Sequence, residues 1–167
     1  MSLKKNIIAF IFIGLLGVLG HFFYKLSGEN TAVGLFFPVN ESTWEHLKLL
    51  FFPTLIYSVG EYIFCEEKPQ NYIPAIVISV FYGMLTIVTL FYTINGILGF
   101  NVDFINILIY FISVIVTLCK KRRLIQNGKF ASKTSRCIFL GIAFLTAVLF
   151  AVFSYNPPSL GLFTPPV

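Results

Sequence analysis

The stretch of sequence that decides the fold is NIIAFIFIGLLGVLGHFFY, residues 6–24. These 19 uncharged residues would form a helix about 29 Å long, which matches the hydrocarbon core of a bilayer. An apolar run that follows Lys4 and Lys5 is also typical of a signal peptide, but this run is long for one and no Ala-x-Ala site follows it. We therefore predict a retained membrane helix.

The composition of the whole chain agrees with that prediction. Of its 167 residues 57% are hydrophobic and only 11% are charged, whereas a soluble domain has about a quarter of its residues charged. The net charge of +5 does not indicate nucleic acid, because the basic residues lie between apolar runs instead of over one face. We expect membrane lipids as partners, and a homodimer is compatible with so small a bundle.

Four more apolar spans follow the first one. We predict an all-α integral membrane bundle of five transmembrane helices in one domain, residues 1–167, because no alternating ten-residue pattern indicates a barrel. We expect Asn95, Gly96 and Gly99 to end the third helix near residue 94. The predicted helices cover residues 6–24, 41–65, 72–94, 103–119 and 137–154.

The distribution of Lys and Arg predicts the orientation. Ten of the twelve basic residues lie at the N-terminus, in the second loop and in the fourth loop, and only Lys25 and Lys48 lie on the other side. This bias predicts a multi-pass protein of the cytoplasmic membrane with its N-terminus inside and its C-terminus outside. It also places Cys65, Cys119 and Cys137 at cytoplasmic helix ends.

The most distinctive stretch is PVNESTWEHLKLLFFP, from Pro38 to Pro53. Asn40 is a plausible N-cap of the second helix. Pro53 has no N–H to donate, so it frees the carbonyl of Leu49, either for a kink or as an acceptor for a ligand or water.

Polar residues within or beside the spans are the candidates for a binding site. Several of them lie near the predicted outer ends of their helices, so they could converge. The candidate ligand-binding residues are His21, Tyr24, Glu41, Glu45, His46, Tyr57, Glu61, Asp103, Asn106 and Tyr110. In the first helix Gly14 and Gly17 share a face with His21, and such small residues let another backbone approach closely.

A divalent metal is one interpretation of this outer cluster. Two His and a carboxylate are the ligand set of some catalytic zinc sites, which here would be His21, His46 and Glu45, or Glu41 in its place. No HExxH pair makes the set specific, and a capped helix end or a structural His–Glu pair explains the same residues.

Two further polar features have alternative interpretations. Glu61 is either a protonatable group in a transport path or an interfacial residue that reaches toward Lys120–Arg123. The fourth helix has a polar stripe that includes Tyr110, Ser113 and Thr117. It predicts either a shared polar interior or hydroxyls that bond to their own backbone carbonyls, and we favour the latter for Ser and Thr.

The runs HFFY (21–24), GLF (34–36), PVNESTWEHLKLLFFP (38–53) and YNPPSLGLF (155–163) resemble a family of small bacterial membrane proteins catalogued only as a domain of unknown function. The resemblance covers nearly the whole chain and is most specific in residues 21–53, where PVNES-x-WEHLKL reads as a signature. It implies a multi-spanning protein of the bacterial cytoplasmic membrane and supplies no activity.

Our leading hypothesis for function is that the chain binds or transports a small polar or amphipathic solute through an outward-facing polar site. The alternatives are a membrane-embedded metal-dependent hydrolase, with a carboxylate as general base, and a non-catalytic membrane subunit. The sequence contains no phosphate-binding loop, G-x-S-x-G elbow or C-x-x-C pair, and identifies no substrate.

Overall fold

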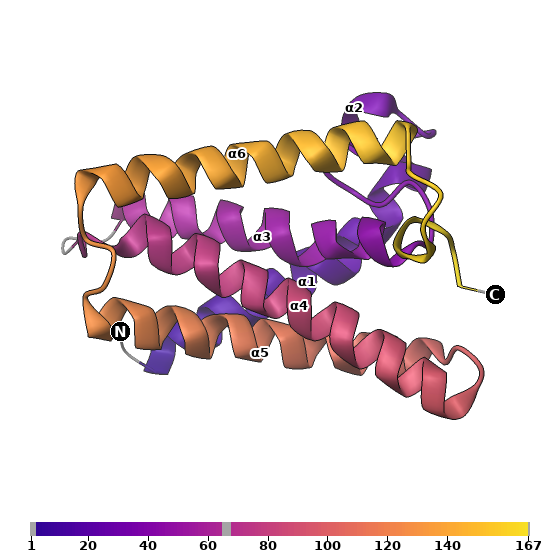
Figure 1. The fold of residues 1–167 in the computed structure, drawn as a ribbon, viewed down its shortest axis with the longest axis horizontal. Coiled ribbons are helices and arrows are strands. Elements are labelled where there is room, and N and C mark those ends of the chain that lie inside the picture. The colour runs from indigo at the N-terminus through magenta and orange to yellow at the C-terminus, as the bar shows by residue number, and fades with distance from the viewer. Residues whose placement is uncertain (1–2, 65–67, 167) are drawn as a thin grey trace.

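A computed structural model describes residues 3–64 and 68–166 of the chain. Five long helices run along the longest axis of the molecule, with a short helix, α2, and a 3-10 turn, η1, at one end (Figure 1). No strand occurs within those two ranges. The elements are α1 (Leu3–Leu26), α2 (Thr31–Gly34), α3 (Thr43–Phe64), α4 (Tyr72–Leu98), α5 (Asp103–Asn127), α6 (Lys133–Tyr155) and η1 (Gly161–Phe163).

The two ends of the bundle carry different connections. The N-terminus and the α5–α6 connection lie at one end, called here the N-terminal end, while α2, the α4–α5 connection and the C-terminus lie at the other, called the α2 end (Figure 1). The basic N-terminal residues and the basic α5–α6 connection therefore lie together at the N-terminal end. That this end faces the cytoplasm stays a prediction.

All five predicted spans are helices in the structure, and all five are long and apolar enough to cross a membrane. Three predicted boundaries differ from the structure by four residues or more, and one of them is the start of the fifth helix, which lies at Lys133 instead of residue 137. The third span does not stop near residue 94 but continues to Leu98, where Gly99, one of the three residues expected to end it, has a left-handed φ of 77°. The fourth continues through the basic residues to Asn127 and ends at Gly128, with a φ of 63°. Cys65, the predicted end of the second span, lies outside the described residues.

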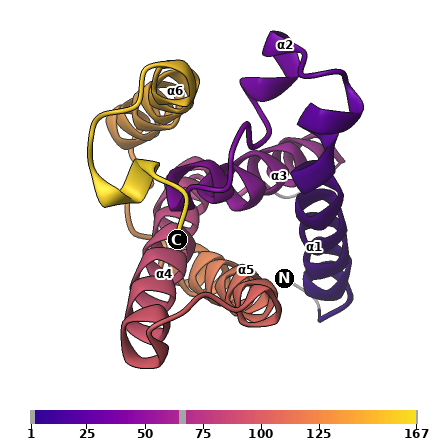
Figure 2. The ribbon, with the colours of Figure 1, turned by 90° about the vertical axis from the view of Figure 1, so that its right-hand side faces the viewer.

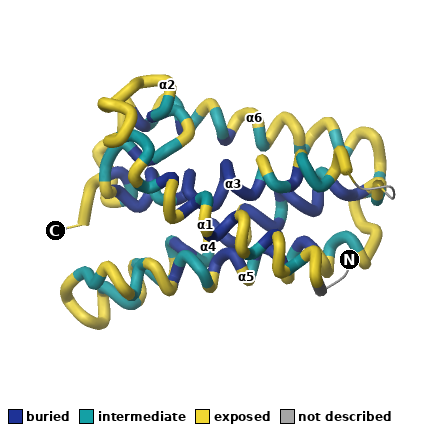
Figure 3. Tube along the Cα trace, turned by 180° about the vertical axis from the view of Figure 1, so that it is seen from behind, coloured by how far each residue is buried: buried dark blue, intermediate teal, exposed yellow. Residues whose placement is uncertain are grey.

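The outer faces of the helices are apolar. Leu15, Leu85 and Phe144 are 60%, 62% and 73% exposed, and many other large apolar side chains lie on the same surfaces. Figure 3 shows exposed residues along α6, where buried positions are few. Water would not tolerate so much contiguous apolar surface, whereas lipid would. The chain thus has the apolar helices of a multi-pass membrane protein.

The core lies where α1, α3, α4 and α5 meet. Ile13, Leu50, Phe51, Val80 and Val114 are fully buried there. The view along the bundle shows α4 beside α5, with α1 and α6 on opposite sides of α3 (Figure 2). This shared core holds in place the helices that line the site described next.

Candidate functional site

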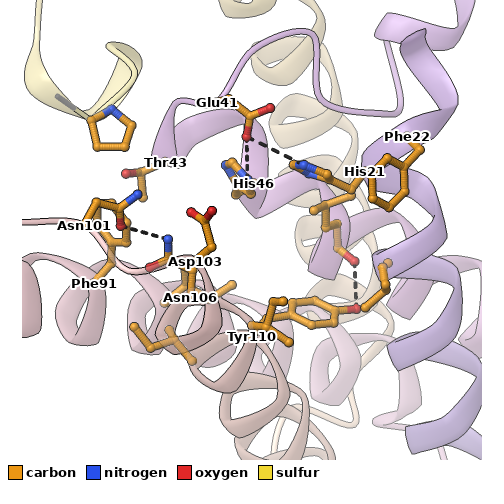
Figure 4. Close-up of a pocket in the computed structure, with 17 residues that line it drawn as sticks. His21, Phe22, Glu41, Thr43, His46, Phe91, Asn101, Asp103, Asn106 and Tyr110 are labelled. Carbon is orange, nitrogen blue, oxygen red and sulfur yellow. Dashed lines mark hydrogen bonds and ion pairs between the residues drawn. The ribbon is translucent and has the colours of Figure 1, made fainter. Parts of the chain in front are cut away.

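A cavity of about 560 Å³ opens at the α2 end, between α1, α3, α4 and α5. Figure 4 shows a polar cluster on one side, from α1 and the start of α3, and a second polar group on α5 across from it. Apolar side chains cover much of the remaining wall, among them Val18, Phe22, Ile87, Phe91 and Ile107. The cavity thus combines a polar rim with an apolar lining, as small-molecule sites usually do.

The polar cluster consists of His21, Glu41 and His46, called here the His–Glu cluster. The Nε2 atoms of His21 and His46 lie 3.7 and 3.5 Å from the same oxygen, Oε2 of Glu41. The ring centroids of the two histidines are 5.2 Å apart. Each residue can direct one ligand atom to a common point, since these atoms lie within 4.8 Å of one another. Within residues 3–64 and 68–166, this is the group whose geometry could hold a metal ion.

The start of α3 orients His46. Its Nδ1 lies 2.8 Å from the carbonyl oxygen of Ser42, so this nitrogen donates, and in a neutral imidazole Nε2 is then the nitrogen with the lone pair. Ser42 also caps the helix, because its Oγ accepts from the backbone N–H of Glu45 at 3.4 Å. The predicted N-cap, Asn40, instead accepts from the N–H of Ser42 at 2.9 Å and forms the turn just before the helix.

The backbone around Glu41 is held by the hydrogen bonds of its neighbours. The side-chain oxygen of Asn40 accepts from the N–H of Ser42, and the N–H of Val39 donates to Oε2 of Glu45 at 2.9 Å. The Glu41 side chain is 53% exposed, and its contacts in the described part of the chain are those with the two histidines. Its backbone is therefore fixed while its carboxylate faces the mouth of the cavity.

The opposite wall is formed by the first turns of α5 and the residues before it. Asp103, Asn106 and Asn101 all line the cavity, and Nδ2 of Asn106 donates to Oδ1 of Asn101 at 2.8 Å. The side-chain oxygen of Asn106 is buried and has no hydrogen-bond partner in the described part of the chain. An unsatisfied acceptor here suits a donor from a bound molecule or water.

Tyr110 forms the inner limit of the cavity. Its hydroxyl lies 2.7 Å from the carbonyl oxygen of Ile13 and 3.2 Å from that of Leu49. The carbonyl that Pro53 frees is therefore an acceptor, as predicted, but for a protein hydroxyl. Gly17 makes room, since a Cβ there would overlap the Tyr110 oxygen and come within 2.8 Å of the Leu49 oxygen.

Below Tyr110 the polar stripe of α5 does not continue the cavity. The hydroxyls of Ser113 and Thr117 each lie 2.8 Å from a carbonyl oxygen four residues earlier in their own helix. Both side chains are fully buried. This confirms the interpretation that these hydroxyls satisfy their own backbone, and neither side chain lines the cavity.

The structure brings together six of the ten predicted site residues. Those that line the cavity are His21, Glu41, His46, Asp103, Asn106 and Tyr110. Tyr24, Glu45, Tyr57 and Glu61 are not among the residues that line it. Tyr24 packs beside Gly34, and the Tyr57 hydroxyl lies 3.2 Å from the carbonyl of Lys5, near the N-terminal end.

Glu45 does not join the two histidines, so the carboxylate of the cluster is that of Glu41. The Glu45 side chain turns away and is buried against Lys48, whose Nζ lies 2.9 Å from its Oε2. Lys48 Nζ also lies 2.7 Å from the carbonyl of Gly34 and 2.5 Å from Oγ of Ser154. Ser154 Oγ is in turn 2.7 Å from Oε1 of Glu45. This ionic cluster joins α3 to α6 and to the last residue of α2.

The sequence reasoning missed Lys48, Ser154 and Asn101. Lys48 had a signal, because a cation within a membrane helix requires a partner and Glu45 lies three residues earlier. Ser154 and Asn101 had none, since their roles depend on contacts that only the folded chain creates.

Glu61 forms a separate cluster toward the N-terminal end. Its carboxylate pairs with Lys121, and the Tyr72 hydroxyl lies 2.5 Å from the same oxygen. Both members of the ion pair are nearly inaccessible to solvent. The contact is the one that the interfacial interpretation of Glu61 expects. Because α5 continues through Lys121, the pair lies between helices and not in a loop.

Residues 1–167 match the family described as "Family of unknown function (DUF6512)". The chain belongs to the DUF6512 family. This confirms the resemblance to a family of unknown function that the sequence indicated. No curated protein and no solved structure matches the chain. The function of this DUF6512 protein has therefore to be argued from its own cavity.

Proposed function

We propose that this protein binds a small amphipathic solute in the cavity at the α2 end, as a membrane binding protein or transporter. The observation that carries the proposal is the composition of the cavity wall. A polar rim of His21, Glu41 and Asp103 borders an apolar surface that includes Phe22 and Phe91. A solute with a polar head and a short apolar chain would complement both parts.

The proposed orientation places this cavity on the outer side of the membrane. The charge bias supports it, because the basic N-terminal residues and the basic α5–α6 connection lie at the opposite end of the bundle. In this outward-facing state, solute would be released inward only after helices move.

A ligand-dependent shift in thermal stability tests the proposal. The protein in lipid nanodiscs is heated with decanoate, decyl phosphate or decylamine, which share one chain and differ in the head. We expect at least one of them to raise the melting temperature, because a ligand that binds only the folded state stabilises it.

Two matched variants on α5 identify the site. Ile107 lines the cavity and Ile112 does not, yet both are about half exposed, at 49% and 46%. Ile107→Trp should fill the cavity and abolish the shift, while Ile112→Trp should preserve it. An equal shift in both variants would show that the ligands act elsewhere, and no shift with any ligand in the unmodified protein would contradict the proposal.

A metal-dependent hydrolase is the second candidate, favoured by the His–Glu cluster together with Asp103 on the facing wall. Release of nitrophenol from 4-nitrophenyl decanoate tests it. We expect any zinc-dependent turnover to be lost in Asp103→Asn, if Asp103 activates the attacking water. Turnover that persists in this variant excludes Asp103 as the base.

A further inference from the structure

We propose that His21, Glu41 and His46 bind one divalent transition-metal ion of the zinc class, with an open coordination position that faces the cavity. This deepens and rests on the proposed function, because the ion would be the polar anchor for an oxyanion head of the solute. The metal site itself is argued from geometry that does not depend on any solute.

The spacing of the ligand atoms fits a shared ion better than direct bonds. Two ligands that bind zinc at about 2.0–2.2 Å with a tetrahedral angle lie about 3.4 Å apart. The Glu41 oxygen lies 3.7 Å from the His21 nitrogen and 3.5 Å from the His46 nitrogen. Both separations exceed those of ordinary N–H···O hydrogen bonds, which are about 2.7–3.2 Å. Two imidazoles therefore point at one carboxylate oxygen without a good bond to it.

The second ring nitrogen of His46 is bound as in metal sites. Metal-ligating histidines almost always donate their other N–H to a carboxylate or a backbone carbonyl, which fixes the tautomer. Nδ1 of His46 has such a partner in the carbonyl of Ser42, at 2.8 Å. Nε2 is then the atom with the lone pair, and it is the atom that faces Glu41.

The donor set selects the class of ion. Two imidazoles and one carboxylate suit zinc and its neighbours, whereas calcium and magnesium prefer oxygen ligands alone. Three protein ligands leave a fourth tetrahedral position open, as in catalytic zinc sites.

The three side chains are also reachable. His21, His46 and Glu41 are 31%, 34% and 53% exposed, so an ion can enter from water at the end of the bundle. His21 lies in α1, Glu41 in the turn before α3, and His46 in α3 itself. A bound ion would therefore join the first helix to the second long helix at the rim of the cavity.

Zinc titration of the protein without a histidine tag tests the metal site. The protein is treated with EDTA, reconstituted in nanodiscs and titrated with Zn²⁺ by calorimetry, with no solute present. We expect one ion per chain. His21→Ala, Glu41→Gln and His46→Ala should each weaken binding by more than about 100-fold, since loss of outer-shell partners alone costs 10–100-fold.

A carboxylate variant outside the cavity serves as the matched control. Glu29→Gln removes an exposed carboxylate on the connection after α1. It should bind Zn²⁺ as the unmodified protein does. Binding that is absent from the unmodified protein, or equally strong in the His46→Ala and Glu41→Gln variants, overturns the site.

The absorption spectrum of bound Co²⁺ distinguishes a metal ligand from a structural residue at position 46. Co²⁺ in the unmodified protein should show the absorption of a four-coordinate ion. His46→Cys should keep the ion and add a thiolate charge-transfer band, because cysteine is a metal ligand in its own right. A spectrum without that band, with Co²⁺ still bound, would show that His46 is not a ligand.

The zinc experiment tests the metal site and the decyl-ligand experiment tests the proposed function, so the failure of one can be told from the failure of the other. If zinc binds but no decyl ligand shifts the melting temperature, the metal site stands and the proposed solute does not. If decyl ligands bind equally well with and without zinc, the cavity function stands and the ion is not its anchor. The expected result is that zinc strengthens the binding of decanoate and decyl phosphate but not of decylamine.

Discussion

The hydroxyl of Tyr110 lies 3.2 Å from the carbonyl oxygen of Leu49, the acceptor that Pro53 leaves without a helical donor. Tyr110→Phe should therefore lower the free energy of unfolding by about 1–3 kcal/mol, the cost of an unsatisfied buried acceptor. Pro53→Ala restores an N–H at position 53, so the cost of Tyr110→Phe should be smaller in that background. Denaturant unfolding of the four proteins in mixed micelles measures the coupling.

Tyr92→Phe is the control for the loss of a hydroxyl, since Tyr92 is exposed and its OH lies 3.1 Å from the carbonyl of Gly161. Tyr92→Phe should lower the free energy of unfolding much less than Tyr110→Phe does. Strict additivity of Tyr110→Phe and Pro53→Ala would contradict the assignment of Tyr110 as the replacement donor.

The buried pair of Lys48 and Glu45 leads to a second prediction. Both side chains are inaccessible to solvent, so Lys48→Met leaves a carboxylate buried without its cation and should destabilise the protein by about 3–5 kcal/mol. The double variant Lys48→Met with Glu45→Leu removes both charges and should recover part of that loss. Denaturant unfolding in mixed micelles measures the stability of both variants, and Lys25→Met, which changes an exposed lysine, is the control. A double variant less stable than Lys48→Met would contradict the pairing.

The close contact between α4 and α5 at Gly83 leads to a third prediction. A Cβ at Gly83 would overlap Oγ1 of Thr117 and meet Cδ2 of Leu50 at 2.7 Å. Gly83→Ala should therefore destabilise the protein by about 1–3 kcal/mol through overpacking.

Gly141 is the matched control for Gly83. It lies within α6, and within the described part of the chain no neighbouring atom comes within 4 Å of the place that a Cβ would take. Gly141→Ala should leave stability unchanged or raise it by up to about 1 kcal/mol, as expected for this substitution in a helix. The same thermal melt compares both variants. Equal effects would mean that the α4–α5 contact is looser than the structure indicates.

Cysteine labelling tests the orientation. In a background with all three cysteines changed to Ser, Ala32→Cys places a thiol in α2 and Lys129→Cys places one in the α5–α6 connection. A membrane-impermeant maleimide should label Ala32→Cys in intact cells and Lys129→Cys only after permeabilisation. The reverse pattern would invert the orientation, and equal labelling would contradict an odd number of spans between the two positions.

Much of the fold could be predicted because lipid imposes a simple rule on composition. Each of the five helices contains an apolar run long enough to cross the bilayer, and the runs are visible without any tertiary information. The ends of α4 and α5 could not be placed so easily. Asn95 and Gly96 are tolerated inside α4 because the next residues continue its backbone hydrogen bonds, and the true stop is the left-handed Gly99.

The site could be predicted only in part. The convergence of His21 with the start of α3 was expected from polarity, and Gly17 and Gly20 allow the approach. Which glutamate joins the histidines depends on where α3 begins. Ser42 and Glu45 have the spacing of a capping box, which would have placed Glu45 inside the helix and Glu41 outside it. The contact of Lys48 with Ser154 required the position of α6 and could not be derived from either residue.

That last contact has a consequence for biosynthesis. Ser154 follows Lys48 by 106 residues, so a chain made from its N-terminus supplies this hydroxyl only with its final long helix. Until then the ammonium group and its carboxylate partner lack one of the groups that solvate them. The first turns of α3 should thus stay near interfacial water during insertion and enter their final dry environment only when α6 arrives. Completion of translation, on this view, is what completes the ionic cluster of Lys48, Glu45 and Ser154.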